Sequence, residues 1–122
     1  MKIIESINRA DDMCPNAFTQ DDKIGWLSEL DGKIKAEIID THEGSEDYEF
    51  SEYTTDDLEK DLIVSFPYDV LYVKYLEAQI HYANGDIGKY SNSMAMFNEK
   101  MDEFTRYYNR HNMPKGTKHK YF

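Results

Sequence analysis

Apolar and polar residues alternate with helical spacing over residues 87–108. Every third or fourth position is apolar, and polar residues occupy the positions between them. This spacing places the apolar side chains on one face of an α-helix, and a face of this length needs partner helices. Because the face is rich in aromatic residues and methionine, it indicates packing in a bundle rather than in a two-stranded coiled coil. The apolar positions are Ile87, Tyr90, Met94, Phe97, Met101, Phe104 and Tyr108.

A second helix, with a broader apolar face, is predicted over residues 67–84, with Pro67 in its first turn. Gly85 can adopt the left-handed conformation that ends a helix, and Asp86 can cap the helix that follows. The short connection predicts an antiparallel hairpin of these two helices at the centre of the fold. The broad face consists of Tyr68, Val70, Leu71, Tyr72, Val73, Tyr75, Leu76, Gln79, Ile80 and Ala83.

Two further helices are predicted before this hairpin. The first spans residues 2–13 and ends before Pro15. The second begins with Thr19 as its N-cap and Asp22 in a capping-box pattern, and it extends to residue 40 or 42. Ile24, Leu27, Leu30, Ile34 and Ile38 form its apolar stripe, Asp31, Lys33, Lys35 and Glu37 are expected to face solvent, and Trp26 lies off the stripe as a second contact surface or a rim residue.

The segment between these pairs of helices, residues 43–65, is called the acidic loop. Between residues 43 and 61 it holds nine acids and one base, and it accounts for most of the net charge of −10. Its brief alternation of polar and apolar residues fits a short β-hairpin, and an extended loop fits equally well. Such a charge argues against nucleic acid as a direct ligand, because phosphate binding needs a basic face.

The chain is therefore predicted to be a single all-α domain over residues 1–122, a bundle of about four helices with an acidic loop and an extended basic tail at residues 111–122. No apolar run is long enough to span a membrane, and the N-terminal residues turn charged too early for a secretory signal. The one cysteine, Cys14, cannot form an internal disulfide, which favours a reducing compartment.

The chain offers no catalytic, cofactor or metal site that its spacing supports. His42 and Glu43 lack a second histidine one turn away, so they are interpreted as a surface pair. The acidic loop lacks the residue order that wraps calcium, and Cys14 has no neighbour in sequence that could activate it. Because the predicted buried faces are apolar, we expect a protein that is not an enzyme.

Two stretches resemble a known class of proteins. They are residues 16–42 (NAFTQDDKIGWLSELDGKIKAEIIDTH) and residues 66–114, which begin FPYDVLYVKYLEAQIHYANGDIGKYSNS and end NRHNMP. Both resemble head–tail connectors, or adaptors, small proteins encoded in the head-and-tail gene blocks of tailed phages and prophages of low-GC Gram-positive bacteria.

The resemblance implies a structural virion protein without catalytic residues. A helical protomer would form a homo-oligomeric ring below the portal, around the channel through which DNA leaves the head. Its partners would be the portal protein and a tail-completion protein, with no specific nucleic-acid binding and no membrane. Its location would be the virion and, during assembly, the cytoplasm of the host bacterium.

Within such a ring, the basic tail is expected to dock on the acidic loop of the next protomer, since head-to-tail contact of complementary patches closes rings. Without the resemblance, a solvated terminus would be the simpler interpretation. The expected interface comprises Arg110, Lys115, Lys118 and Lys120, the terminal Tyr121 and Phe122, the acids Glu46, Asp47, Glu49 and Glu52, and Trp26.

A different class of function also fits a small acidic protein, namely a helical regulator that binds a protein partner or inhibits an enzyme by mimicking DNA. A DNA mimic distributes its acids along an exposed face. Here most of the excess lies in one loop, which favours the connector interpretation.

Overall fold

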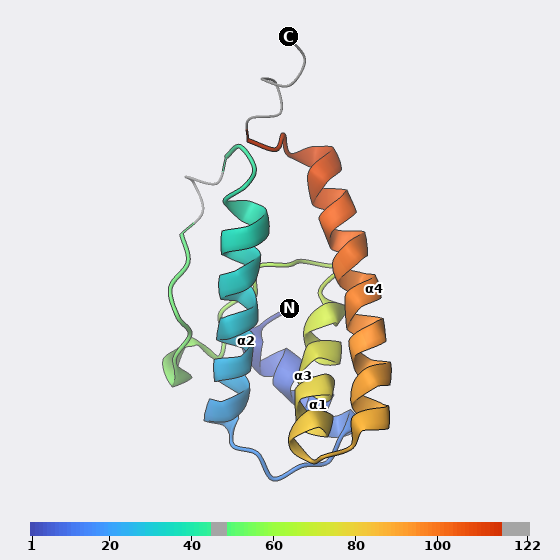
Figure 1. Ribbon diagram of the computed structural model, residues 1–122. Coiled ribbons are helices and arrows are strands. Elements are labelled where there is room, and N and C mark those ends of the chain that lie inside the picture. The colour runs from blue at the N-terminus through green and yellow to red at the C-terminus, as the bar shows by residue number, and fades with distance from the viewer. Residues whose placement is uncertain (45–48, 116–122) are drawn as a thin grey trace.

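Four α-helices form a bundle with the α3–α4 hairpin at its centre (Figure 1). The computed structural model describes residues 1–44 and 49–115. This arrangement confirms the predicted all-α fold. The elements are α1 (Ile3–Met13), α2 (Gln20–Ile34), the π-helix η1 (Lys35–Ile39) that continues α2, the 3-10 turn η3 (Thr55–Asp57), α3 (Val70–Ala83) and α4 (Ile87–His111).

The turn between α3 and α4 has the predicted chemistry. Gly85 has a φ of 78°, which favours glycine. Asp86 accepts a hydrogen bond from the Lys89 backbone N–H at 3.1 Å and so caps α4.

The predicted start of α3 at Pro67 is wrong. The helix begins at Val70, because residues 65–68 form a separate turn in which the Tyr68 N–H donates to the Ser65 carbonyl.

The start of α2 and its contact with α1 both depend on polar side chains. The Thr19 hydroxyl accepts from the Asp22 N–H at 3.2 Å, and the Asp22 carboxylate accepts from the Thr19 N–H at 3.4 Å, which confirms the capping box. An ion pair of 2.8 Å between Lys23 and Asp11 joins α2 to α1, although the Lys23 side chain is almost fully buried.

The core lies where α1 and α2 pack against α3, and α3 packs against α4. Leu71, Tyr72 and Leu76 of α3 are fully buried, as expected for the central helix. Burying a leucine side chain stabilises a fold by roughly 1.5–3 kcal/mol. The apolar face of α3 therefore organises the other three helices.

The apolar face of α4 is covered only in part. Phe97 and Phe104 are buried, Met94 and Met101 are half-buried, and Ile87 is 59% exposed. The prediction that Ile87 belongs to the core is therefore wrong. The reason is that α3 covers the middle of this face, whereas α2 and α4 have no extensive direct contact.

The described part of the acidic loop is extended and contains only η3, so the alternative of a β-hairpin is wrong for residues 49–65. Backbone hydrogen bonds hold this part against the N-terminal residues. The Ile3 N–H donates to the Lys60 carbonyl at 3.0 Å, and the Leu62 N–H donates to the Met1 carbonyl at 2.9 Å. Since Tyr53, Leu62 and Val64 are buried, this acidic stretch belongs to the folded body.

Candidate functional site

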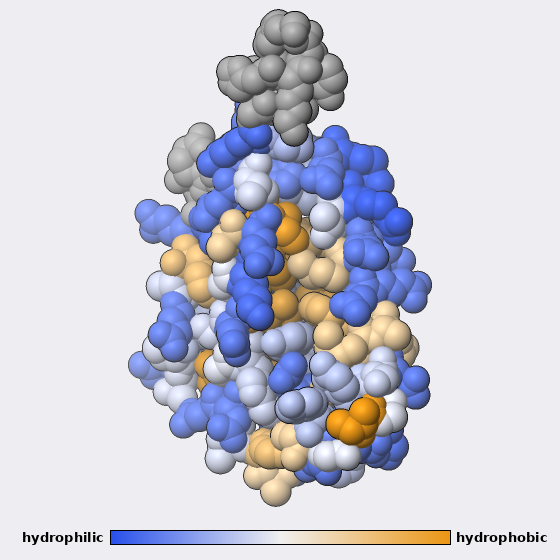
Figure 2. Space-filling view, in the orientation of Figure 1, coloured by the Kyte–Doolittle hydropathy of each residue, from blue (hydrophilic) through white to orange (hydrophobic). Residues whose placement is uncertain are grey.

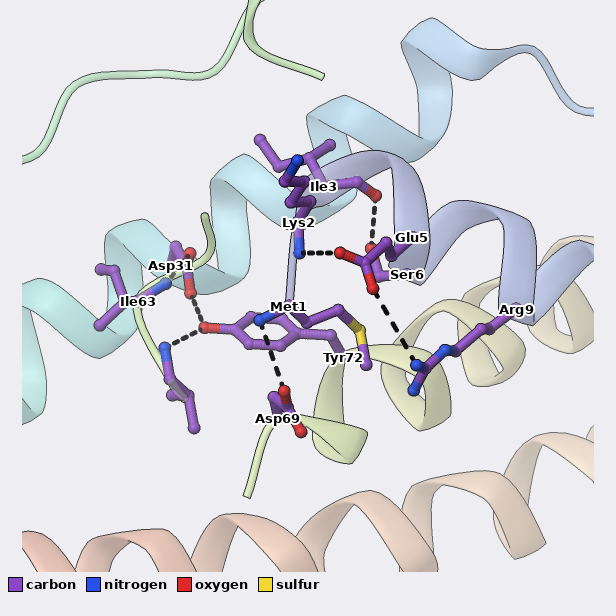
Figure 3. Close-up of polar contacts among 11 residues, drawn as sticks. Met1, Lys2, Ile3, Glu5, Ser6, Arg9, Asp31, Ile63, Asp69 and Tyr72 are labelled. Atoms are coloured by element: carbon purple, nitrogen blue, oxygen red, sulfur yellow. Dashed lines mark hydrogen bonds and ion pairs between the residues drawn. The ribbon is translucent and has the colours of Figure 1, made fainter. Parts of the chain in front are cut away.

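Asp31 is fully buried, so the prediction that it faces solvent is wrong. Its carboxylate accepts hydrogen bonds from the Tyr53 hydroxyl at 2.5 Å, the Tyr72 hydroxyl at 2.6 Å and the Ile63 N–H at 3.1 Å. The Tyr72 hydroxyl in turn accepts from the Val64 N–H at 2.8 Å. Figure 3 shows Tyr72 reaching from α3 toward Asp31 on α2. We call these five residues the polar junction.

Burial and internal hydrogen bonds act in opposite directions on the carboxylate of the polar junction. Burial raises the pKa of Asp31, and the hydrogen bonds from Tyr53, Tyr72 and Ile63 oppose this rise. Burial, and then the charge of Asp31, raise the pKa of Tyr72 well above its usual value. A carboxylate without access to solvent cannot meet a substrate. It joins the end of the acidic loop to α2 and α3.

The sequence does contain a signal for this burial. Asp31 lies four residues after Leu27 and three before Ile34, which puts it on the same face of α2 as these two buried residues. Its charge favours the interpretation as a solvent-facing residue, and its donors are 22 and 41 residues away, beyond any local pattern.

Cys14 has polar neighbours that the sequence does not indicate. Its sulfur lies 3.4 Å from His81 Nε2 and 3.9 Å from Glu77 Oε1, beside a cavity of about 200 Å³. The other carboxylate oxygen of Glu77 forms an ion pair of 3.1 Å with Lys74. Burial and the negative charge of Glu77 raise the pKa of the thiol. This environment favours the thiol over the reactive thiolate.

Within residues 1–44 and 49–115, no group of three or more histidine, cysteine, aspartate and glutamate side chains could hold a metal ion. No helix among these residues is both long and apolar enough to cross a membrane.

His42 is buried, so its interpretation as a surface residue is wrong. Its Nδ1 lies 2.5 Å from the Ile38 carbonyl, and its Nε2 lies 2.6 Å from Asn109 Oδ1 on α4. The ring also meets the ring of Tyr108 edge-on, with centroids 4.7 Å apart. His42 therefore joins the end of η1 to the end of α4.

The last described residues pair with the residues around His42. The Glu43 N–H donates to the Met113 carbonyl at 2.8 Å, and the Lys115 N–H donates to the Thr41 carbonyl at 2.7 Å. Pro114 lies opposite His42 in an antiparallel bridge. The acidic loop and the basic tail thus begin side by side in one chain.

A groove runs between α2 and α4, and we call it the α2–α4 groove. Its floor is apolar, its volume is about 260 Å³, and Figure 2 shows apolar side chains between the two helices. Two charged residues, Lys33 and Glu37, lie among its walls. The lining residues are Leu30, Lys33, Ile34, Glu37, Ile38, Tyr75, Met94, Phe97 and Met101.

The structure describes five of the predicted interface residues. Arg110 and Lys115 are exposed at and just after the end of α4, and Glu49 and Glu52 are exposed on the acidic loop. Trp26 is half-buried, with Phe18 edge-on at a centroid distance of 5.8 Å. The remaining ones, Glu46, Asp47, Lys118, Lys120, Tyr121 and Phe122, lie outside the described residues.

Comparison of the chain with protein-family models, with curated proteins and with solved structures gave no match. The interface and the resemblance to head–tail connectors therefore stay predictions. What the structure contributes is the place of each predicted residue and the α2–α4 groove, which the sequence does not reveal.

Proposed function

We propose that this chain is the protomer of a head–tail connector ring, a structural protein of a tailed-phage particle. One observation supports this proposal more than any other. The two stretches that resemble connectors, residues 16–42 and 66–114, correspond to α2 with η1 and to the α3–α4 hairpin. The resemblance thus covers three of the four helices of the bundle.

Two separate surfaces suit a heterologous contact between copies. At one end of the bundle, where α1 and α3 end and α4 begins, Met13, Tyr82 and Ile87 are each about 60% exposed or more. At the other end, the described part of the basic tail, residues 111–115, pairs with residues 41–43. Head-to-tail contacts between different patches generate rings when the rotation closes.

The net charge of −10 also suits a channel for DNA. Phosphates are repelled by an acidic surface, so DNA can pass without binding. The exposed acids Glu49, Glu52 and Asp56 belong to the described part of the acidic loop and contribute to this charge.

The test is to mix the purified full chain with its cognate portal protein, and to examine the mixture by light scattering and negative-stain electron microscopy. We expect a ring bound to the portal. A chain ending at Lys115 should lose the ring or the portal complex while keeping its helical circular dichroism, because residues 113–115 still pair with residues 41–43.

Absence of any portal complex with the full chain would contradict the connector proposal. Normal assembly of the chain ending at Lys115 would contradict the role of the tail. Competition with DNA for a nuclease or a repressor, without portal binding, would instead favour the acidic regulator.

A further inference from the structure

Two exposed arginines share one face of α4 near its C-terminal end. Arg106 and Arg110 are four residues apart, so their side chains are neighbours on the helix surface, and Tyr107 borders the same face. Within residues 1–44 and 49–115, neither arginine forms an ion pair, whereas most of the other lysines and arginines there do. The helix dipole favours a cation in the last turn, but Arg106 lies before that turn. We call these three residues the arginine face.

A hollow of the opposite charge lies between α2 and the acidic loop, and we call it the glutamate hollow. The Tyr53 N–H donates to the Ser28 hydroxyl at 3.0 Å, which holds the loop against the helix. Glu29 and Glu52 are exposed and form no ion pair with the residues that the structure describes. The volume of the hollow is about 410 Å³, and its lining residues are Gly25, Ser28, Glu29, Phe50 and Glu52.

The glutamate hollow has an aromatic wall as well as two carboxylates. The ring of Phe50 is half-buried, and the ring of Tyr53 meets it edge-on with centroids 5.3 Å apart. A guanidinium group forms hydrogen bonds with carboxylates through its planar fork of N–H donors, and it also stacks on aromatic rings. The side chains of the hollow therefore fit an arginine.

The arginine face cannot reach the glutamate hollow of its own chain. Arg110 follows Asn109, which contacts His42 after the end of η1. The helical rise from Glu29 to Ile39 alone is about 15 Å, which is longer than an arginine side chain. Two complementary surfaces that lie apart on one molecule can be paired by a second copy of the same chain.

We propose that the arginine face of one copy docks in the glutamate hollow of a second copy, with the two arginines on the two carboxylates and Tyr107 against Phe50. Tyrosine and arginine are enriched among the residues that dominate binding energy at interfaces, and complementary charges fix the register of a contact. The net charge of −10 opposes a nucleic acid as the occupant of the arginine face. The inference rests on the proposed ring, because it specifies the contact between neighbouring protomers.

The test measures self-association of the full chain alone, by sedimentation velocity over a range of concentrations at low ionic strength. We expect oligomers that dissociate as salt is added, since salt screens exposed charges. Arg110→Glu should raise the dissociation constant by at least about tenfold, because it places a carboxylate against the carboxylates of the hollow. Arg9→Glu changes the net charge by the same amount at an exposed position of α1, so it is the matched control and should associate normally.

A charge swap tests whether these two surfaces meet. Glu52→Arg alone should weaken association, and the double variant Arg110→Glu/Glu52→Arg should recover part of it, because the pair forms again with reversed charges. A full chain that stays monomeric would overturn the proposal, as would equal effects of Arg110→Glu and Arg9→Glu, or a double variant no better than the single ones. None of these results would contradict the connector proposal, which is tested separately with the portal protein.

Discussion

The polar junction and the α2–α4 groove both include residues of α2. They differ in whether their side chains are buried and hydrogen-bonded or partly exposed and apolar. In the junction, polar atoms of Asp31 and Tyr72 are withdrawn from water, and each has hydrogen-bond partners. In the groove, apolar side chains such as Met101 stay partly in water. The junction therefore satisfies its polar groups within the fold, while the groove leaves apolar surface in contact with water.

This difference has an energetic consequence. A buried polar group that loses its partner costs about 1–3 kcal/mol, and more when it is charged. Shortening a half-exposed apolar side chain costs much less, since it leaves no closed cavity. Substitutions in the junction should therefore affect stability strongly, and substitutions in the groove should affect it weakly.

The largest effect is expected for Asp31→Ala. This change leaves the Tyr53 hydroxyl, the Tyr72 hydroxyl and the Ile63 N–H without their acceptor. We expect the free energy of unfolding in urea to fall by about 3–5 kcal/mol.

The matched control for Asp31→Ala is Glu29→Ala, an exposed acid on the same helix, which should change stability by less than about 0.5 kcal/mol. If both variants had equal stability, the junction would contribute nothing specific, and the comparison of the two regions would fail.

An intermediate effect is expected for Tyr72→Phe. The Tyr72 hydroxyl both donates to Asp31 and accepts from the Val64 N–H. Its removal should lower the free energy of unfolding by about 2–3 kcal/mol. Tyr53→Phe removes the donation to Asp31 while Tyr72 and Ile63 still donate, so its effect should be smaller. The reverse order of the two variants would contradict the assigned geometry.

The fold was largely predictable because its signals are local. The 3.5-residue spacing of α4, the Thr19–Asp22 box and the Gly85–Asp86 turn each lie within a few residues, and each is observed. The polar junction was not predictable from such signals, because its partners come from α2, α3 and the acidic loop. The groove was not predictable for a related reason. The apolar pattern of α4 predicts which face is apolar, but it does not predict how much of that face α3 covers.

The junction should also carry a pH dependence. Burial raises the pKa of Asp31 in the folded protein above the ordinary value of about 3.9. At a pH between the ordinary pKa of the unfolded state and the raised pKa of the folded state, the folded state binds more protons than the unfolded state. Stability therefore falls as the pH rises through this window.

Asp31→Asn removes this titration, so the difference in unfolding free energy between the wild type and Asp31→Asn isolates it. The wild type should lose stability relative to the variant from about pH 3.9 upward, by about 1.4 kcal/mol for each unit by which the pKa is raised. Urea unfolding at several pH values measures this difference. A difference that rises with pH would show that hydrogen bonding outweighs burial.

The smallest effect is expected in the groove, for Met101→Ala. In a chain ending at Lys115, the loss should be below about 1 kcal/mol, because Met101 is half-exposed and no closed cavity forms. Urea unfolding of the full chain and of the chain ending at Lys115 measures this loss.

The matched control is Met96→Ala, because Met96 is about half exposed on the same helix and does not line the groove. It should lower the free energy of unfolding by a similarly small amount. A loss for Met101→Ala as large as the loss for Asp31→Ala would contradict the distinction between the groove and the junction, because it would show that the groove side chains are as important to the fold as the buried polar groups.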